Sequence, residues 1–417
     1  MKKKTIFVLS DHPMSPSGVG IQTRYMIEGL LKTGKYRFVC LGGAVKHHDY
    51  KTQSVEPWGE DFLVHPIDGY GNAQVVRSVI RKEKPDLMWF MTDPRFWGWL
   101  WEIEDEVRPM MPMVYYHVWD NFPYPKYNKA HYDSNDLVVT ISKVTDEIVK
   151  NVAPDVESIY HPHTVDTNVF KPLQEAEEVE FKNQFFKSNK DKVVFFWNNR
   201  NARRKQSGTL IYWFKEFLDK IGRDKAALIM HTDVKDPHGQ DLEVIIRELG
   251  ITNGEVMFST QKLPPEHLAK IYSTVDCTIN ISDAEGFGLA TLESLACGTP
   301  IIVNMTGGLQ EQVTDGEEWF GIGLEPKAKA VIGSQEIPYI YEDRIIKEDF
   351  IDALTKIYEM SKEERKELGE KGRQHVLNNY GFEQYQEGWV KIIDDTIEKY
   401  GSWDTRKHYN HWTISEI

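Results

Sequence analysis

Two carboxylates, Glu285 and Glu293, stand eight positions apart in the stretch SDAEGFGLATLESLACGTPIIV. The turn Gly286-Phe287-Gly288 lies between the first of them and a run whose apolar residues repeat with the period of a helix. Backbone N–H groups at a helix start have no intrahelical partner, and glycines leave them open to an anion. The stretch therefore predicts an anion-binding turn with two carboxylates beside it.

The segments on either side predict where this turn lies in a sheet. Residues 277–282 (CTINIS) before it and residues 300–303 (PIIV) after it are apolar and β-branched, which is typical of buried strands. The local order is then strand, turn, helix, strand, with the turn at the carboxyl end of a parallel strand. That edge is where α/β proteins bind their ligands.

A second group of polar residues follows another expected strand, VVFFW (Val193 to Trp197). Arg200 and Lys205 lie in the loop directly after it, and Arg203 and Arg204 could share their role. Cations at this place can reach a phosphate. The plain alternative is a solvated basic loop.

Short apolar runs alternate with helical patterns through the first half of the chain, which predicts βαβ units and a doubly wound parallel sheet. The first strand leads into Ser17-Gly18-Val19-Gly20 and then a helix, so Gly18 and Gly20 either admit a phosphate or form an ordinary turn. The expected strands are TIFVLS, FVCLG, FLVHPI, LMWFM, MVYYH, LVVTIS and ESIYH.

The pattern restarts after a polar, charged stretch, so we expect two domains. Residues 1–170 would form the first, 171–192 a linker and domain start, and 193–382 the second. A capping box, Ser361-x-x-Glu364, predicts a helix start. A last helix within residues 383–417 is expected to pack back on the first domain.

Tryptophans and tyrosines gather in one short part of the first half. They could form platforms for sugar rings, but Trp89 and Tyr115 fall within expected strands. We therefore expect most of these rings to be core.

Composition excludes several classes of protein. The chain has 417 residues, 41% of them hydrophobic, and no apolar run long enough for a membrane span, so a cytoplasmic protein without a transmembrane segment is expected. Its three cysteines show no C-x-x-C spacing, which argues against a disulfide framework or a structural zinc. Residues 1–170 hold 19 Lys and Arg against 22 Asp and Glu, which disfavours general nucleic-acid binding.

As a set, these segments resemble the family-4 retaining glycosyltransferases, also called glycosyl transferases group 1. Glu285 and Glu293 look like the family's Glu-x7-Glu motif, and Arg200 with Lys205 is similar to its Arg-x4-Lys pair. HTVDTNVFKP (His163 to Pro172) and TGGLQEQVTDG (Thr306 to Gly316) resemble two further family segments. The resemblance implies the GT-B fold, in which two Rossmann-like, doubly wound parallel-sheet domains face each other across a cleft.

The resemblance also implies a role for each candidate residue. The C-terminal half would hold a nucleoside-diphosphate sugar (UDP, GDP, ADP or dTDP) as a substrate, and no cofactor or metal is expected. Glu285 would contact the donor sugar and Glu293 the ribose. The residues for the diphosphate would be Arg200, Lys205, Gly18, Gly20, Gly286, Phe287 and Gly288.

The acceptor side rests on fewer residues. His117 resembles the family's N-domain histidine that contacts the donor sugar, although a lone histidine is often structural. Asp120 and Asn121 would orient the acceptor hydroxyl or form a turn, and Asp120 is the expected catalytic residue of the two. Phe122 and Tyr124 are the acceptor-site candidates.

The expected activity is metal-independent transfer of a sugar to a hydroxyl acceptor (a glycan, a lipid-linked or a small molecule) with retention at the anomeric carbon, through same-face departure and attack. Where relatives have Gly-Arg after the first strand of the second half, this chain has Asn199-Arg200, so no particular donor is implied. The alternatives are a viral-type DNA-base glycosyltransferase, a GT-B phosphorylase or epimerase, and a non-catalytic nucleotide-sugar binding protein. Peripheral membrane contact and the oligomeric state stay open.

Overall fold

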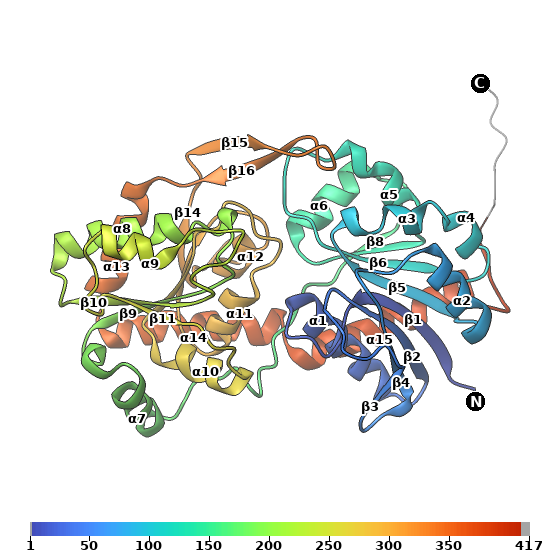
Figure 1. Cartoon of the computed structure of the whole chain (residues 1–417), viewed down its shortest axis with the longest axis horizontal. Coiled ribbons are helices and arrows are strands. Elements are labelled where there is room, and N and C mark those ends of the chain that lie inside the picture. Colours follow the sequence, from blue (N-terminus) through green and yellow to red (C-terminus); the bar gives the residue numbers. More distant parts are fainter. Residues whose placement is uncertain (1, 410–417) are drawn as a thin grey trace. The chain divides into compact units, whose positions relative to one another are not determined.

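The computed structural model describes residues 2–409 and divides into two compact units, each built around its own sheet (Figure 1). One unit comprises the residues up to His163 and those from Glu383 onward, and the other comprises Thr164–Phe382. Both have a parallel sheet with flanking helices, which confirms the predicted α/β class. The segment 171–192, expected as a linker and domain start, carries helix α7 (Glu175–Phe185) of the second unit.

The sheet of the first unit has eight strands in the order β3-β4-β2-β1-β5-β6-β7-β8. All neighbours pair in parallel except β3 and β4, which are antiparallel. The seven strands expected in this half are all present, and only β3 was not foreseen. The bounds are β1 (Lys4–Asp11), β2 (Tyr36–Gly43), β3 (Gln53–Val55), β4 (Gly59–Pro66), β5 (Leu87–Thr92), β6 (Met113–His117), β7 (Leu137–Thr140) and β8 (Ser158–Tyr160).

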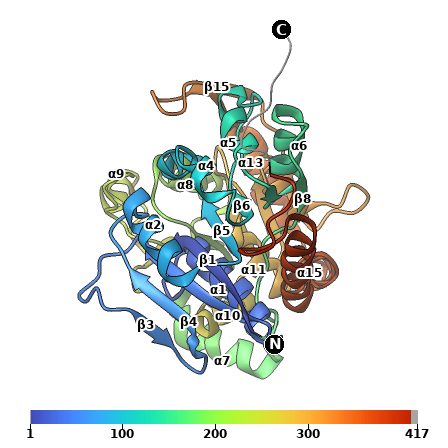
Figure 2. The ribbon, with the colours of Figure 1, turned by 90° about the vertical axis from the view of Figure 1, so that its right-hand side faces the viewer.

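Helix α15 (Phe382–Tyr400), from the far end of the sequence, lies beside α1 (Gly18–Leu31) in this unit (Figures 1 and 2). The two helices approach closely at Gly29, where a Cβ would lie 2.7 Å from Cβ of Gln386. The other helices are α2 (Ala73–Glu83), α3 (Gly98–Trp101), α4 (Glu104–Val107), α5 (Lys129–Asp133) and α6 (Lys143–Val152), with 3₁₀ turns η1 (Pro94–Phe96) and η2 (Lys126–Asn128).

Most of the clustered tryptophans and tyrosines of the first half are core residues, as expected. Trp89, Trp97 and Tyr115 have no exposed surface, and Trp101 and Trp119 are buried. The ring of Trp389 on α15 meets that of Trp89 edge to face, with centroids 5.7 Å apart. Helix α15 is therefore an integral part of this core.

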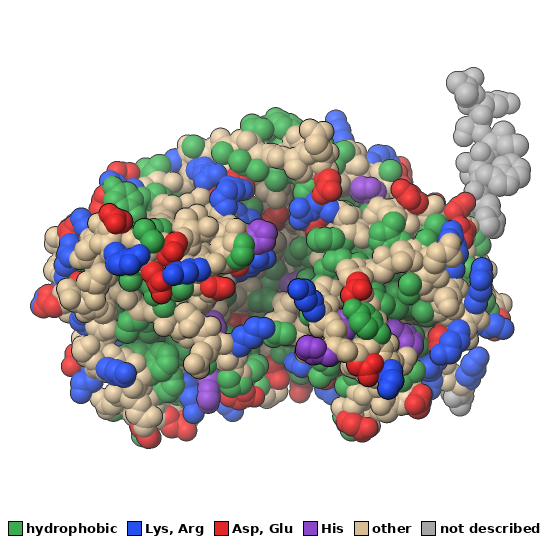
Figure 3. Space-filling model, viewed as in Figure 1, with side chains coloured by type: hydrophobic (Ala, Val, Ile, Leu, Met, Phe, Trp, Pro, Cys, Tyr) green, Lys and Arg blue, Asp and Glu red, His purple; other side chains and the backbone are tan. Residues whose placement is uncertain are grey.

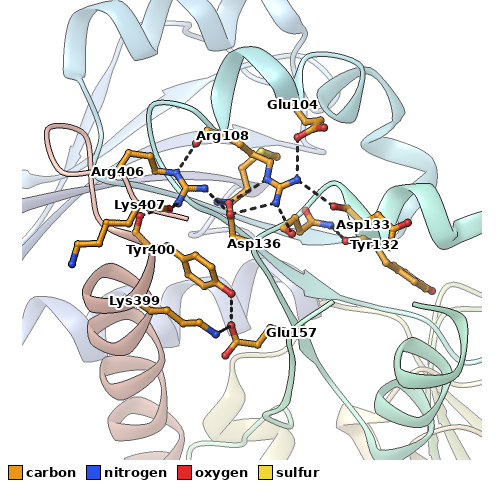
Figure 4. Close-up of polar contacts among 12 residues, drawn as sticks. Glu104, Arg108, Tyr132, Asp133, Asp136, Glu157, Lys399, Tyr400, Arg406 and Lys407 are labelled. Carbon is orange, nitrogen blue, oxygen red and sulfur yellow. Dashed lines mark hydrogen bonds and ion pairs between the residues drawn. The ribbon is translucent and has the colours of Figure 1, made fainter. Parts of the chain in front are cut away.

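The segment after α15 is fixed to the first unit by a buried carboxylate, Asp136 (Figure 4). Its side chain is 2% exposed and receives Nη2 of Arg406 at 2.6 Å and Nη2 of Arg108 at 3.4 Å. The backbone N–H of Met113 donates to the same carboxylate at 2.9 Å. One carboxylate thus binds two guanidinium groups that are largely removed from water, and Arg108 also pairs with Glu104 at 3.2 Å.

We expect Asp136→Asn to lower the free energy of unfolding of this unit by about 3–5 kcal/mol, because it leaves two guanidinium groups facing a neutral partner. Asp133→Asn is the matched control, since its carboxylate pairs with the exposed Lys129 and such pairs contribute about 0.5 kcal/mol, while its backbone carbonyl keeps the bond from Arg108. Denaturant titration measures both variants. Equal losses in the two would contradict this account.

The sheet of the second unit is parallel throughout, in the order β11-β10-β9-β12-β13-β14. The five strands expected here, in VVFFW, AALIMHT, EVMFST, CTINIS and PIIV, are present, and β14 was not foreseen. The bounds are β9 (Val193–Asn198), β10 (Ala226–His231), β11 (Val256–Ser259), β12 (Cys277–Asn280), β13 (Ile301–Asn304) and β14 (Gly321–Leu324).

Helices cover both faces of this sheet (Figure 1). The capping box at Ser361 and Glu364 opens α14, as predicted. One layer contains α8 (Ser207–Ile221), α9 (Leu242–Glu248) and α13 (Lys347–Glu359). The other contains α10 (Pro265–Thr274), α11 (Leu289–Ala296) and α14 (Lys362–Asn379), and shorter elements are α12 (Leu309–Val313), η3 (Lys187–Asn189) and η4 (Arg203–Lys205).

A separate two-stranded hairpin, β15 (Ala328–Ile332) and β16 (Ile340–Arg344), completes the second unit. Acidic and basic side chains are interspersed over the face shown in Figure 3. Within residues 2–409, no helix is long and apolar enough to cross a membrane.

Candidate active site

The two candidate loops of the second unit meet at the carboxyl edge of its sheet. Strands β9 and β12 are neighbours, so the loops that follow them emerge side by side. The backbone N–H of Asp283, after β12, donates to the carbonyl of Arg204, in η4 after β9, at 2.8 Å. The parallel topology thus places Lys205 next to Glu285, although 80 positions separate them.

Lys205 and Glu285 form an ion pair between these loops. Their side chains are only 9% and 12% exposed, and Nδ2 of Asn280 donates to the same carboxylate at 3.2 Å. Burial alone would raise the pKa of Glu285, but the charges of Lys205 and Arg204 and the two hydrogen bonds hold it below its ordinary value. Glu285 is therefore a carboxylate at neutral pH, oriented by two donors.

Arg200 does not join this pair. Its guanidinium binds Asp236, after β10, through contacts of 2.6 and 3.2 Å, and its side chain is 61% exposed. Arg204 instead donates to the carbonyl of Ala284, and its charge contributes to the lowered pKa of Glu285. Of the two cations expected to converge, the structure brings Lys205 to Glu285 and leaves Arg200 on Asp236.

The Gly286-Phe287-Gly288 turn precedes α11 as predicted. Gly288 has φ +93°, a conformation that favours glycine. The ring of Phe287 is buried against Tyr380, with centroids 5.8 Å apart. The expected contact of Phe287 with a diphosphate would therefore be made by its backbone.

A neighbouring loop after β13 holds this turn from the other side. Gly308 lies so close that a Cβ would be 2.7 Å from Cα of Phe287, and its N–H donates to the carbonyl of Glu285 at 3.1 Å. Nε2 of Gln312 donates to the carbonyls of Phe287 and Gly288 at 2.7 and 3.2 Å. Gly308 and Gln312 thus hold the expected anion-binding turn through its backbone carbonyls and the Cα of Phe287.

Glu293 lies on α11, the helix that follows the glycine turn, and its surroundings differ from those of Glu285. The hydroxyl of Tyr272 donates to its carboxylate at 2.9 Å, and Nδ2 of Asn198 donates to that hydroxyl at 2.8 Å. Burial raises the pKa of Glu293 to about 7, while the hydrogen bond from Tyr272 acts to lower it. Two glutamates of one motif are therefore held in different states, since only Glu285 has a cation against it.

In the first unit, Gly18 and Gly20 begin α1 after β1. A Cβ on Gly20 would lie 2.3 Å from Oγ of Ser15, so the close approach of this loop requires glycine. The N–H of Gly20 donates to Oγ of Ser17 at 3.0 Å, which makes Ser17 the helix cap. Oγ of Ser17 in turn donates to the buried Asp11 at 2.5 Å.

His117, expected to contact a sugar, is completely buried at the end of β6. Because the Tyr115 hydroxyl donates to a backbone carbonyl, it accepts a hydrogen bond from the Nδ1–H of His117 at 3.0 Å. Nε2 then accepts from the hydroxyl of Tyr132 at 2.9 Å. Burial lowers the pKa of His117 to about 3, so the ring is neutral. These bonds are those of a histidine with a structural role, the alternative to a contact with the sugar.

The acceptor candidates lie on the loop after β6. Asp120 and Asn121 are half-buried, and the Asn121 carbonyl accepts the indole N–H of Trp119 at 2.9 Å. The rings of Phe122 and Tyr124 meet edge to face at 5.6 Å, and Tyr124 donates to Glu147 at 2.7 Å. Their expected roles stay predictions.

Several residues that shape the site were not foreseen from the sequence. Tyr272 lies on α10, and Asp11 lies at the end of β1, where the position of an acidic residue before a glycine loop was an available signal. Asn280 and Asp283 adjoin the carboxylate motif and could have been included on that ground. Residues at the base of the β15–β16 hairpin also contact the site loops, and no motif in the sequence indicated them.

Comparison with known proteins agrees with this architecture. Residues 178–375 match the family model described as glycosyl transferases group 1. A D-inositol 3-phosphate glycosyltransferase of Corynebacterium jeikeium is 34% identical over 129 residues, which is 30% of each chain. The enzyme of the same name from Acidothermus cellulolyticus is 41% identical over 76 residues, 18% of this chain and 16% of the relative. The matched stretches thus span less than a third of these relatives.

Solved structures extend the likeness to nearly the whole chain. Sucrose-phosphate synthase from Thermosynechococcus elongatus superposes with a TM-score of 0.74 at 16% identity, covering 95% of this chain and 100% of that one. HepE from Anabaena, in complex with UDP and glucose, gives 0.68 at 14% identity, covering 94% and 100%. The fold is GT-B, and the second unit carries the stretch that is similar to the group 1 glycosyltransferases.

No group of three or more His, Cys, Asp or Glu side chains suited to a metal ion occurs within residues 2–409. The three cysteines are all buried thiols.

The raised pKa of Glu293 predicts a pH-dependent difference between the wild type and Glu293→Gln. The folded state favours the protonated acid, so the contribution of Glu293 to stability is fully present below its ordinary pKa of 4.5 and is lost as the pH rises through about 7. Relative to the glutamine variant, the wild type should therefore lose stability between about pH 4.5 and 7. Denaturant titrations across this range measure the difference.

Tyr272→Phe removes the hydrogen bond that lowers this pKa, so the loss should extend to higher pH in that variant. Glu367→Gln, on the exposed surface of α14, is the control and should keep the wild-type profile. A Glu293→Gln difference that is the same at every pH would refute the assignment.

Proposed function

We propose that this protein transfers a sugar from a nucleoside-diphosphate donor to a hydroxyl acceptor, with retention at the anomeric carbon and without a metal ion. The observation that carries the proposal is the buried Lys205–Glu285 pair beside the glycine turn, at the carboxyl edge of the second sheet. The pair brings a cation and an ionised carboxylate to one point. A sugar diphosphate can bind both groups, because its phosphates attract a cation and its hydroxyls donate hydrogen bonds to a carboxylate.

In the proposed complex, the diphosphate lies against Lys205, Arg204 and the N–H groups of the Gly286-Phe287-Gly288 turn. Glu285 accepts a hydrogen bond from a hydroxyl of the donor sugar, and Glu293 accepts from the ribose. Arg200 would have to leave Asp236, which it binds through two contacts of 2.6 and 3.2 Å, to reach the phosphates. Lys205 is therefore the principal phosphate ligand in this proposal.

The first unit would supply the acceptor site. Gly18 and Gly20 keep their proposed place near the donor phosphate, Asp120 orients the acceptor hydroxyl, and Phe122 and Tyr124 contact the acceptor. His117 supports this region from the core, since both of its ring nitrogens are hydrogen-bonded to buried tyrosines.

The proposed reaction breaks the bond between the anomeric carbon and the donor phosphate oxygen, and forms a bond to the acceptor oxygen on the same face. The acceptor proton passes to the departing phosphate oxygen, and the charge on that phosphate is stabilised by Lys205 and Arg204 in place of a metal. Glu285 is engaged by Lys205 and Asn280, so we assign it to positioning of the sugar and electrostatic stabilisation.

The comparisons suggest the first compounds to test. One similar structure is titled as a complex with UDP and glucose, and others are named for sucrose phosphate or trehalose 6-phosphate. The curated relatives are named for D-inositol 3-phosphate. We therefore propose UDP-glucose as the first donor and phosphorylated polyols or sugars as the first acceptors.

A thermal-shift panel of UDP, GDP, ADP and dTDP sugars should identify one donor that raises the melting temperature, because a ligand that binds only the folded state stabilises it. Lys205→Ala and Glu285→Gln should reduce transfer by about 100-fold or more, the size expected for a lost electrostatic contact at the transition state. Transfer is measured as nucleoside diphosphate released in the presence of acceptor.

Lys215→Ala, on α8 away from the site, is the control and should keep wild-type transfer. Full activity of the Lys205 and Glu285 variants would refute the assignment. Donor binding without transfer to any acceptor would favour a nucleotide-sugar binding protein.

A further inference from the structure

The β15–β16 hairpin lies outside the six-stranded sheet and contributes nothing to the hydrophobic core of its unit. In Figure 1 it stands apart from the other elements of the second unit. Its outer part is exposed, including Val331 at 65% and Tyr339 at 45%. Glu342, Asp343 and Arg344, at the base of the hairpin, contact the loops of the candidate site.

Glu342 binds two arginines from different segments. Its carboxylate receives Nη1 of Arg203 at 2.9 Å and Nη2 of Arg344 at 2.9 Å, and its side chain is only 4% exposed. Arg203 lies two residues before Lys205 and in the same 3₁₀ turn. The hairpin therefore holds the loop that carries the cation of the candidate site.

Arg344 and Asp343 hold the loop that carries the carboxylate. Nη1 of Arg344 binds Oδ2 of Asp283 at 2.8 Å, and the N–H of Asp343 donates to the carbonyl of Asp283 at 2.8 Å. Gln206 donates to the same Asp283 carboxylate at 2.5 Å. Asp283 lies two residues before Glu285, just as Arg203 lies two residues before Lys205. The hairpin therefore binds the chain two residues before each member of the ion pair.

The third loop of the site is bound as well. The side chain of Thr306 donates to the Asp343 carboxylate at 2.7 Å, and Nδ2 of Asn304 donates to the Asp343 carbonyl at 3.0 Å. This loop continues directly to Gly308, which packs on the glycine turn. Three consecutive residues at the hairpin base thus contact all three loops.

We propose that the hairpin is a clamp that aligns Lys205 with Glu285 for donor binding, and that Glu342 is its principal positioning residue. The alignment follows from the contacts above, and its effect on the donor rests on the function proposed for the site. Glu342 acts through its contacts with Arg203 and Arg344, and through the contact of Arg344 with Asp283.

The charges explain why Glu342 should matter more than its neighbours. It is the carboxylate shared by Arg203 and Arg344, and a buried carboxylate that loses its charge leaves its arginines poorly compensated. Arg203 would then lose its bidentate partner, and the 3₁₀ turn with Lys205 would be held at one side only. A catalytic group displaced by about 1 Å can cost a large factor in rate.

The test compares Glu342→Gln with Glu336→Gln, the same change at the exposed tip of the same hairpin. In the full-length protein without ligand, we expect faster amide hydrogen exchange in residues 203–206 and 282–288 of Glu342→Gln, and wild-type exchange in Glu336→Gln. The melting temperature should fall in Glu342→Gln, because its buried carboxylate loses its charge beside Arg203 and Arg344, and should stay unchanged in Glu336→Gln. Wild-type exchange in both loops of Glu342→Gln would overturn the proposal.

The second readout uses UDP-glucose as the probe. We expect its Kd, from calorimetry, to rise about tenfold in Glu342→Gln, as for a misplaced binding group, and to stay unchanged in Glu336→Gln. If Glu342→Gln does not fold, Arg203→Gln breaks the same contact from its half-exposed side and should give the same result.

The outcomes separate this inference from the proposed function. Wild-type affinity in Glu342→Gln, together with loss of binding in Lys205→Ala, would overturn the clamp alone. Faster exchange in Glu342→Gln, with no binding of any nucleotide sugar by the wild type, would support the clamp and contradict the proposed donor.

Discussion

The second unit is organised around one buried ion pair, Lys205 with Glu285. Burying two charges is costly unless they are paired and hydrogen-bonded, so the surrounding backbone must hold them close together. The parallel sheet makes this feasible, because β9 and β12 are neighbours and both of their loops leave from the same edge. Asn280 donates to the Glu285 carboxylate, and the N–H of Asp283 joins the two loops through the carbonyl of Arg204.

The same constraint explains the different states of the two motif glutamates. Glu285 has Lys205 against it and is ionised, whereas Glu293 has only the hydroxyl of Tyr272 and a pKa raised to about 7. A donor with a diphosphate and a ribose would present a different group to each. The proposed division of roles between the glutamates thus follows from their surroundings as well as from the family motif.

The sequence predicted the α/β class and nearly all strands of the two large sheets, because hydrophobic periodicity is a local signal. The family resemblance assigned Lys205 and Glu285 to one donor site, but not to each other. The sequence did not predict the partner of Arg200, since Asp236 lies 36 residues away on another loop. Nor could it decide for His117, whose state depends on the hydroxyls of Tyr115 and Tyr132 packed around it. The exposed, weakly patterned hairpin gave no sequence signal, yet its base contacts all three site loops.

A double-mutant cycle tests the central claim that Lys205 and Glu285 act as one unit in donor binding. The affinity for UDP-glucose is measured by calorimetry in the wild type, Lys205→Met, Glu285→Gln and the double variant. The account predicts strong coupling, with the double variant binding about as weakly as the weaker single variant. Losses of affinity that simply add would show that the two residues act independently and would contradict the account.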